Sequence, residues 1–451
     1  MKHFFIMFLT LFILGCSSSG GGNSDNTPST QPKGDSPVDS PVELPEQPPV
    51  IVPPSTTTQL PLLVIQVEFN DIQFVSPTSS WQKKIFGKES SELNHYYLEI
   101  SQDSFLFIPA NENADSVNDG FIKVHVNQNH IQTLGADFNK YPEFVNILAE
   151  ALFLADPSIN FANYDANENK KIDVNELQIM FLVAGGEEAS GANPGIWAHQ
   201  SCINGLVLDN ISLMQCDNGS YTAFGERHFS INGPDASIGI IAHELGHGVF
   251  YLPDLYDRDL SSEGIGNFGL MGAGSWGFQQ GELPGNTPVP MSAWSKAKVG
   301  FTTPQLITST TPNLSLEATG TKNYQSFRLN TQDPNEYFLI ENRSSLGYDS
   351  GLYILNETIF QGGLAIWHVD ENQSHNDNEN RKLLDLEEAD GFHLDTAGNQ
   401  GNQSNLFHSG NNQFTTESSP ANSHLYNGNS SGINIRNISV PGSTMFLDLE
   451  I

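Results

Sequence analysis

The sequence predicts an α+β fold in two parts, a mixed α/β part at residues 59–305 and a β-rich, sandwich-like part at residues 306–451. Pro61–Phe69 is a short, continuous apolar run of the kind that forms a buried strand. Tyr141–Ala155 instead repeats apolar residues at helical spacing. From Tyr337 onward, short alternating segments are separated by Gly and Asn turns, which favours an all-β end to the chain.

Other elements are expected between these segments. Trp81–Ile100 is expected to be largely helical, and Phe121–Val126 alternates like a half-buried strand. Leu177–Val183 reads as a further strand. The 40 glycines and 25 prolines also favour a protein rich in strands and loops over a helical bundle.

The first 58 residues are expected to be an export signal and a tether. The apolar run Phe4–Leu14 is shorter than the roughly 20 residues that span a bilayer, which is typical of a secretory signal. Ile13–Cys16 is similar to a bacterial lipobox, which assigns the signal peptide to residues 1–15 and a lipid to Cys16; the alternative is an ordinary signal peptide with an incidental cysteine. Residues 16–58 are rich in Ser, Gly and Pro, cannot bury a core, and are expected to form a disordered tether. We therefore expect an exported lipoprotein at the outer membrane or cell surface of a bacterium, or released from it, whose lipid is its only membrane contact.

The strong negative charge excludes one class of partner. The chain has 52 Asp and Glu against 19 Lys and Arg, a formal net charge of -33. Nucleic-acid binding needs clustered Lys and Arg, so no nucleic-acid partner is expected. The charge favours solubility and can attract divalent cations. We expect a monomer.

A twelve-residue segment, Asp165–Glu176, fits a calcium-binding loop at most positions. Lys170 departs from the pattern, because that position normally holds the Gly of a sharp turn. We expect a weak or structural Ca²⁺ site there, the alternative being a polar turn before the next strand. The expected oxygen donors are Asp165, Asn167, Asn169, the Lys171 carbonyl, Asp173 and Glu176.

Cys202 and Cys216 are the only cysteines of the expected folded region. In an exported protein, two cysteines that flank a short apolar stretch predict a disulfide. The alternative is a pair of reduced, buried thiols.

The strongest chemical signal is a His-Glu-x-x-His motif formed by His243, Glu244 and His247. Residues 238–242 before it are small or apolar and lack proline, which predicts a buried helix. Positions i and i+4 share a helix face, so both imidazoles can bind one metal ion. Glu244 is then placed to act as general base on a water at the open position of a catalytic zinc.

Around this motif the chain resembles the immune inhibitor A family of zinc metallopeptidases, which is related to the metzincins. Leu252–Asp257 and Phe268–Trp276 are typical of that family, and the second segment resembles its methionine turn. The resemblance implies that Met271 lies beneath the metal without binding it. Further matches extend it from about Leu60 to the C-terminus: Pro288–Phe301, Glu341–Arg343, Gly347–Asp349, Gly362–Asp370 and Glu388–Gly391.

The third metal ligand departs from the common metzincin spacing. That count falls on Pro253, which cannot bind a metal, so the ligand is displaced by at least one residue. The helix is expected to end near Gly248, and Pro253 then fixes the backbone just before Asp254. We predict that Asp254 is the third ligand, with Asp257 as the fallback.

These observations predict an exported, lipid-anchored zinc endopeptidase with a metzincin-like catalytic part, acting on protein or peptide substrates. Zn²⁺ is the expected cofactor, held by His243, His247 and Asp254, and Glu244 is the expected general base for the zinc-bound water. One alternative is a catalytically silent surface-binding or adhesion lipoprotein on the same fold, against which the intact Glu244 counts. Another is a periplasmic metal-storage protein, which only the charge favours.

Overall fold

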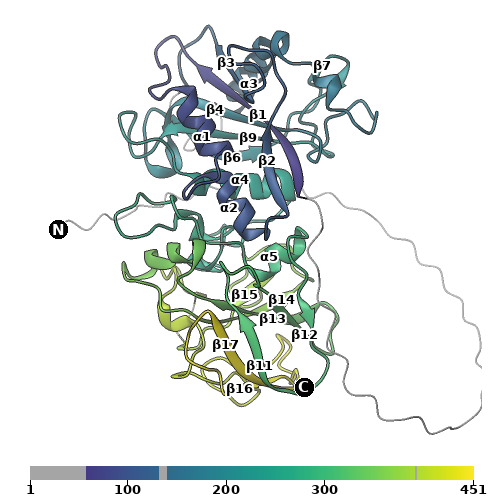
Figure 1. Ribbon diagram of the computed structural model, residues 1–451, viewed down its shortest axis with the longest axis vertical. Coiled ribbons are helices and arrows are strands. Elements are labelled where there is room, and N and C mark those ends of the chain that lie inside the picture. Colours follow the sequence, from purple (N-terminus) through teal and green to yellow (C-terminus); the bar gives the residue numbers. More distant parts are fainter. Residues whose placement is uncertain (1–56, 132–139, 392–393) are drawn as a thin grey trace, which may run out of the picture. The chain divides into compact units, whose positions relative to one another are not determined.

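The computed structural model describes residues 57–131, 140–391 and 394–451 (Figure 1). Cys16, the expected signal peptide and nearly all of the expected tether lie outside the described residues. Thr56–Ile451 form one compact unit, and the boundary expected after residue 305 stays a prediction. Among the described residues, no helix is both long and apolar enough to cross a membrane.

A mostly parallel sheet forms the framework of the first part. Its hydrogen-bonded order is β2-β1-β4-β9-β6, with β3 also pairing with β1 and β5 with β4. All of these pairs are parallel except β6 with β9, so β6 is an antiparallel edge strand. The strands are β1 (Thr58–Glu68), β2 (Phe105–Pro109), β3 (Phe121–His125), β4 (Gln178–Glu187), β5 (Gly195–Ile196), β6 (His199–Ser201) and β9 (Tyr221–Arg227).

Helices cover both faces of this sheet because successive strand residues point to opposite sides. Leu63 and Ile65 of β1 share a core with α3, whereas Leu62 and Val64 share another with α1, α2 and α4. The central strands are apolar on both faces, as expected for a covered parallel sheet. The helices are α1 (Thr78–Phe86), α2 (Leu93–Ile100), α3 (Tyr141–Ala155), α4 (Ile238–Phe250) and α5 (Ala293–Lys298).

Two helices occupy the segment Trp81–Ile100, which the sequence predicts to be largely helical. The chain leaves the helix at Gly87, whose backbone is extended, and α2 begins only at Leu93. In between, the Glu92 carboxylate accepts a hydrogen bond from the Glu89 amide at 2.7 Å. The helical spacing of apolar residues resumes after this loop, so the interruption was not visible in the pattern.

The second part contains a five-stranded sheet, β10-β12-β13-β14-β15, and a three-stranded sheet, β11-β17-β16. On one face, Phe338 and Ile366 pack with Leu447 of the smaller sheet. On the other face, Trp367 joins the core that also contains α4. The strands are β10 (Gln305–Leu306), β11 (Thr311–Glu317), β12 (Ser326–Asn330), β13 (Glu336–Arg343), β14 (Gly363–Asp370), β15 (Leu384–Leu386), β16 (Asn434–Arg436) and β17 (Thr444–Glu450), and a separate hairpin joins β7 (Val207–Leu208) to β8 (Ile211–Ser212).

The architecture is therefore mixed α/β, with several sheets and few helices among the described residues. The five-stranded sheet separates two apolar cores, and α4 belongs to the core that this sheet shares with the large parallel sheet.

Candidate metal centre

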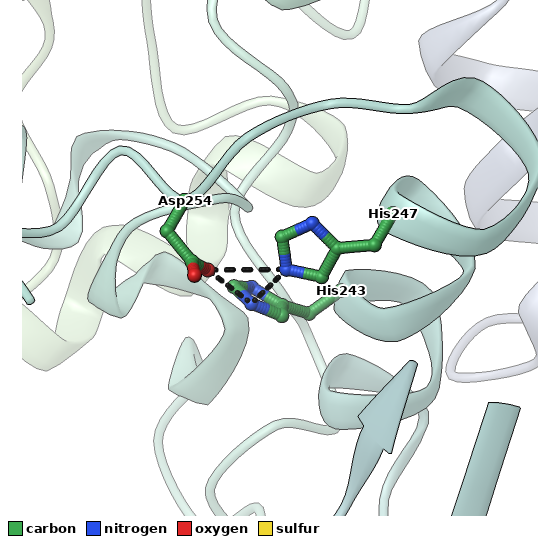
Figure 2. A group of neighbouring side chains, drawn as sticks. All are labelled: His243, His247 and Asp254. Carbon is green, nitrogen blue, oxygen red and sulfur yellow. Dashed lines mark hydrogen bonds and ion pairs between the residues drawn. The ribbon is translucent and has the colours of Figure 1, made fainter. Parts of the chain in front are cut away.

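His243 and His247 lie one turn apart on α4 and turn their rings toward the same point (Figure 2). Their Nε2 atoms are 3.2 Å apart. Asp254, on the loop after the helix, places Oδ1 3.2 Å from Nε2 of His243 and 3.1 Å from Nε2 of His247. These three atoms form a nearly equilateral triangle, which we call the triad.

Backbone carbonyls fix the orientation of both imidazoles. Nδ1 of His243 lies 2.9 Å from the Leu270 carbonyl oxygen, and Nδ1 of His247 lies 2.6 Å from that of Leu252. Because a carbonyl can only accept, each Nδ1 carries the proton of the neutral ring. Each Nε2 therefore presents a lone pair to the triad, as in histidines that bind metals.

The triad fits a zinc ion. With Nδ1 protonated on both rings, its three atoms are all acceptors, and they repel one another unless a cation lies between them. Ligands of a tetrahedral zinc at roughly 2.0–2.2 Å lie about 3.3–3.6 Å from one another, slightly farther apart than these atoms are without the ion. Elsewhere in the described ranges, no group of three or more His, Cys, Asp or Glu side chains brings its ligand atoms this close together.

The turn after α4 differs from the sequence prediction that the helix ends near Gly248. The helix continues to Phe250, and Tyr251, with φ of 53°, ends it in the left-handed conformation. Gly248 serves another purpose, because a Cβ there would lie 3.1 Å from Thr222 of β9. The later turn brings the Leu252 carbonyl to His247 and leads through Pro253 to Asp254.

Asp257, the fallback ligand, is occupied within its own loop. Its carboxylate accepts hydrogen bonds from the Asp259 amide at 3.0 Å, from the Ser261 hydroxyl at 2.9 Å, and from both the amide and the hydroxyl of Ser262 at 2.8 Å. The structure therefore brings Asp254, and not Asp257, to the two histidines.

Met271 lies directly against α4. A Cβ added to Gly246 would come within 2.7 Å of the Met271 sulfur, so a larger residue at this point of the helix would require the Met271 side chain to shift. The Met271 carbonyl accepts the Leu255 amide at 2.8 Å, and its neighbour Leu270 supplies the carbonyl for His243. The segment thus holds both the helix and the ligand loop.

Glu244 lies beside the triad and is buried, with 7% of its surface exposed. Burial raises the pKa of its carboxyl, and Asp254 adds to the rise. His243, His247 and the backbone amide of Gln200 lower it. A raised pKa makes the Glu244 carboxylate a better proton acceptor than an exposed carboxylate.

The triad also holds a proton when no metal is bound. Burial lowers the pKa of His247, but Asp254 and Glu244 raise it by more than that, so that the pKa reaches about 9. Burial raises the pKa of Asp254, and His247 and His243 outweigh this and hold it well below its usual range. At neutral pH and without a metal, His247 therefore carries a second proton that faces Asp254. A metal ion must displace this proton in order to bind.

Sequence reasoning gave no role to three further residues at the site. The Tyr256 ring is stacked near the His243 ring, with centroids 6.2 Å apart and planes 20° apart. Gln200 reaches Glu244 through its backbone, which leaves no side-chain signal. Glu187 is a buried carboxylate at the end of β4 whose electrostatic interaction with Glu244 is unfavourable. A charged residue closing an apolar strand was the only available sign of it.

The expected calcium loop gains no support. The carboxylate of Asp165 accepts the amides of Asn169 and Lys170, and that of Glu176 accepts three backbone amides. Lys170 has φ of 62°, the left-handed conformation for which glycine is the usual residue. The side chain of Lys171 is paired with Asp217.

Cys202 and Cys216 are joined, with Sγ atoms 2.01 Å and Cα atoms 5.0 Å apart. The bond closes a loop that contains the β7–β8 hairpin, remote in sequence from the triad.

Comparison with known proteins gives one family match. Residues 150–302 match the family model described as immune inhibitor A peptidase M6, catalytic domain, a range that contains all three triad residues and α5. No curated protein matches the chain. The crystal structure of wild type OgpA from Akkermansia muciniphila is 12% identical over 77% of this chain and 95% of that one, with a TM-score of 0.25.

Proposed function

We propose that this protein is a zinc-dependent endopeptidase, because residues 150–302 match the family model of the immune inhibitor A peptidase catalytic domain. Its substrates are proteins or peptides, as the family implies. The observation that carries the zinc assignment is the triad, in which three acceptor atoms face one another at 3.1–3.2 Å.

Nε2 of His243, Nε2 of His247 and Oδ1 of Asp254 would hold the zinc. When bound, zinc supplies a Lewis acid that polarises a peptide carbonyl and lowers the pKa of water. The carbonyls of Leu270 and Leu252 keep the two rings turned toward it, since a ring that rotates loses its hydrogen bond.

Glu244 handles the proton in this proposal. Its carboxylate takes a proton from the attacking water and later delivers it to the leaving amine. The raised pKa supports both roles, because a carboxyl with an ordinary pKa gives up its proton too readily to serve as an acid at neutral pH. The backbone amide of Gln200 lies near this carboxylate and favours its charged form.

Two further assignments belong to this proposal. A metzincin-like fold is supported by the helix that bears both histidines, by the methionine packed against it at Gly246, and by the antiparallel edge strand β6. Export and lipid attachment at Cys16 are supported only by the sequence Ile13–Cys16 and the apolar run before it.

Casein hydrolysis by the purified protein tests the activity. We expect hydrolysis that a zinc chelator abolishes and that added Zn²⁺, but not Ca²⁺, restores. Zinc-loaded protein that leaves casein and a broad peptide library intact would favour a silent binding protein and overturn the proposal.

A further inference from the structure

Glu187, outside the triad, ends β4 with its side chain fully buried. Three backbone amides donate to its carboxylate. Oε1 accepts from Ala189 and Ala198, both at 3.0 Å, and Oε2 accepts from Gly225 at 2.9 Å. One carboxylate thus joins the end of β4 to β9 and to the segment that enters β6.

Glycines make this arrangement sterically feasible. A Cβ on Gly225 would lie 2.0 Å from the Gly186 carbonyl oxygen, and a Cβ on Gly195 would lie 2.4 Å from the same atom. Any side chain at these positions would push the strands apart. The backbones therefore approach closely around Glu187, and its amide donors are held in a fixed geometry.

The segment that Glu187 holds leads directly to the proposed base. Ala198 is the residue before β6, and β6 packs against α4. The backbone of Gln200, in the middle of β6, lies close to the Glu244 carboxylate. Glu187 is also near enough to Glu244 for the two charges to interact.

We infer that Glu187 is a positioning residue: it fixes β6 so that the Gln200 amide holds the Glu244 carboxylate in its working orientation. This inference rests on the proposed function, because it assigns Glu187 a role in the same hydrolysis. Without the bond to Ala198, β6 loses one of its anchors. The Glu244 carboxylate then samples orientations in which it cannot reach the attacking water.

Glu187→Gln tests the inference, with Glu226→Gln as its matched control. A glutamine keeps the shape, but its NH₂ group cannot accept an amide, so at least one donor loses its partner. Glu226 is also buried and also accepts backbone amides, from Val75 at 2.9 Å and Ser76 at 2.8 Å, but these belong to another loop.

For Glu187→Gln we expect kcat to fall about 10- to 100-fold while KM stays within about two-fold. Zinc content should stay at one per chain, and amides 198–201 should exchange hydrogen faster. Glu226→Gln should keep kcat within about three-fold of the wild type. An unchanged kcat for Glu187→Gln, or an equal loss in both variants, would overturn the inference.

If Glu187→Gln does not fold, Gln200→Pro decides. Proline on an edge strand is tolerated where its amide is outside the ladder, and it deletes the donor that faces Glu244. The same kcat loss must appear; an unchanged kcat removes the role of β6. A wild type that is inactive with zinc bound would instead be a failure of the proposed function itself.

Discussion

Two buried polar clusters of the molecule are organised in opposite ways. In the ionic cluster, formed by Glu341, Arg343, Asp349 and Lys296, every charge meets its opposite. Arg343 Nε lies 2.9 Å from Asp349, and Lys296 lies 3.1 Å from Glu341. In the triad, by contrast, three acceptors converge. Buried polar groups normally have hydrogen-bonding or ionic partners. A cluster of acceptors that face one another therefore indicates a ligand site, whereas a cluster in which every charge is paired indicates a structural role.

The two clusters are physically linked. Arg343 Nη1 donates to the Phe268 carbonyl at 2.9 Å, and Phe268 lies two residues before the Leu270 carbonyl that orients His243. The ionic cluster therefore holds the segment whose carbonyl orients His243 of the triad.

The largest effect should come from Glu244→Ala. Removing the proposed base should lower kcat by about 10²–10⁴-fold, the usual range for a positioned general base. The triad does not include Glu244, so we expect one zinc per chain in the variant, measured by metal analysis. Hydrolysis near the wild-type rate would contradict the mechanism.

Arg343→Met breaks the ionic cluster instead. It leaves Asp349 buried without its cation, which should lower the free energy of unfolding by about 3–5 kcal/mol. Urea unfolding of wild type and variant measures the difference. A loss below about 1 kcal/mol would mean that the cluster contributes little and that the contrast with the triad is overstated.

His368 sharpens the contrast, since both of its ring nitrogens face carboxylates, Glu387 at 3.1 Å and Glu336 at 3.0 Å. Burial lowers its pKa, but the two carboxylates raise it to about 9. A raised folded-state pKa gives a stability contribution that is complete below pH 6.5 and is lost as the pH rises through about 9. His368→Gln should thus cost about 3 kcal/mol at pH 6 and much less at pH 9.5, by urea unfolding at both values. A pH-independent difference would show that His368 is not held as a cation.

The smallest effect should follow loss of the disulfide. Replacing Cys202 and Cys216 by serine opens a loop with a sequence separation of 14, which should cost about 2–3 kcal/mol. Zinc content should not change, because neither cysteine belongs to the triad. Non-reducing peptide mapping of the purified protein checks the bond, and two freely alkylated thiols would refute it.

Much of the site followed from the sequence because its signals are local. The i and i+4 spacing puts His243 and His247 on one face, and Pro253 singles out Asp254 among the nearby acids. The strands and α3 followed from periodicity in the same way. The end of α4 was predicted too early. Gly248 stays within the helix, which ends at a left-handed Tyr251, and tyrosine rarely adopts that conformation.

The remaining features depend on contacts between distant segments. Arg343 and the Phe268 carbonyl are 75 residues apart in sequence. Glu187 at the end of β4 accepts a hydrogen bond from the Gly225 amide of the neighbouring strand β9. Gln200 acts through its backbone amide, which is the same in every residue but proline. Periodicity and spacing cannot reveal such contacts, because no local pattern encodes them.

The triad's role as a zinc site can be tested most directly by a crystal structure of the zinc-loaded protein, with anomalous data collected at the zinc edge. We predict one strong peak within roughly 2.0–2.2 Å of Nε2 of His243, Nε2 of His247 and a carboxylate oxygen of Asp254. Asp257 should keep its bonds to Ser261 and Ser262. A peak bound by Asp257 and not by Asp254, or no peak at the two histidines, would contradict the account.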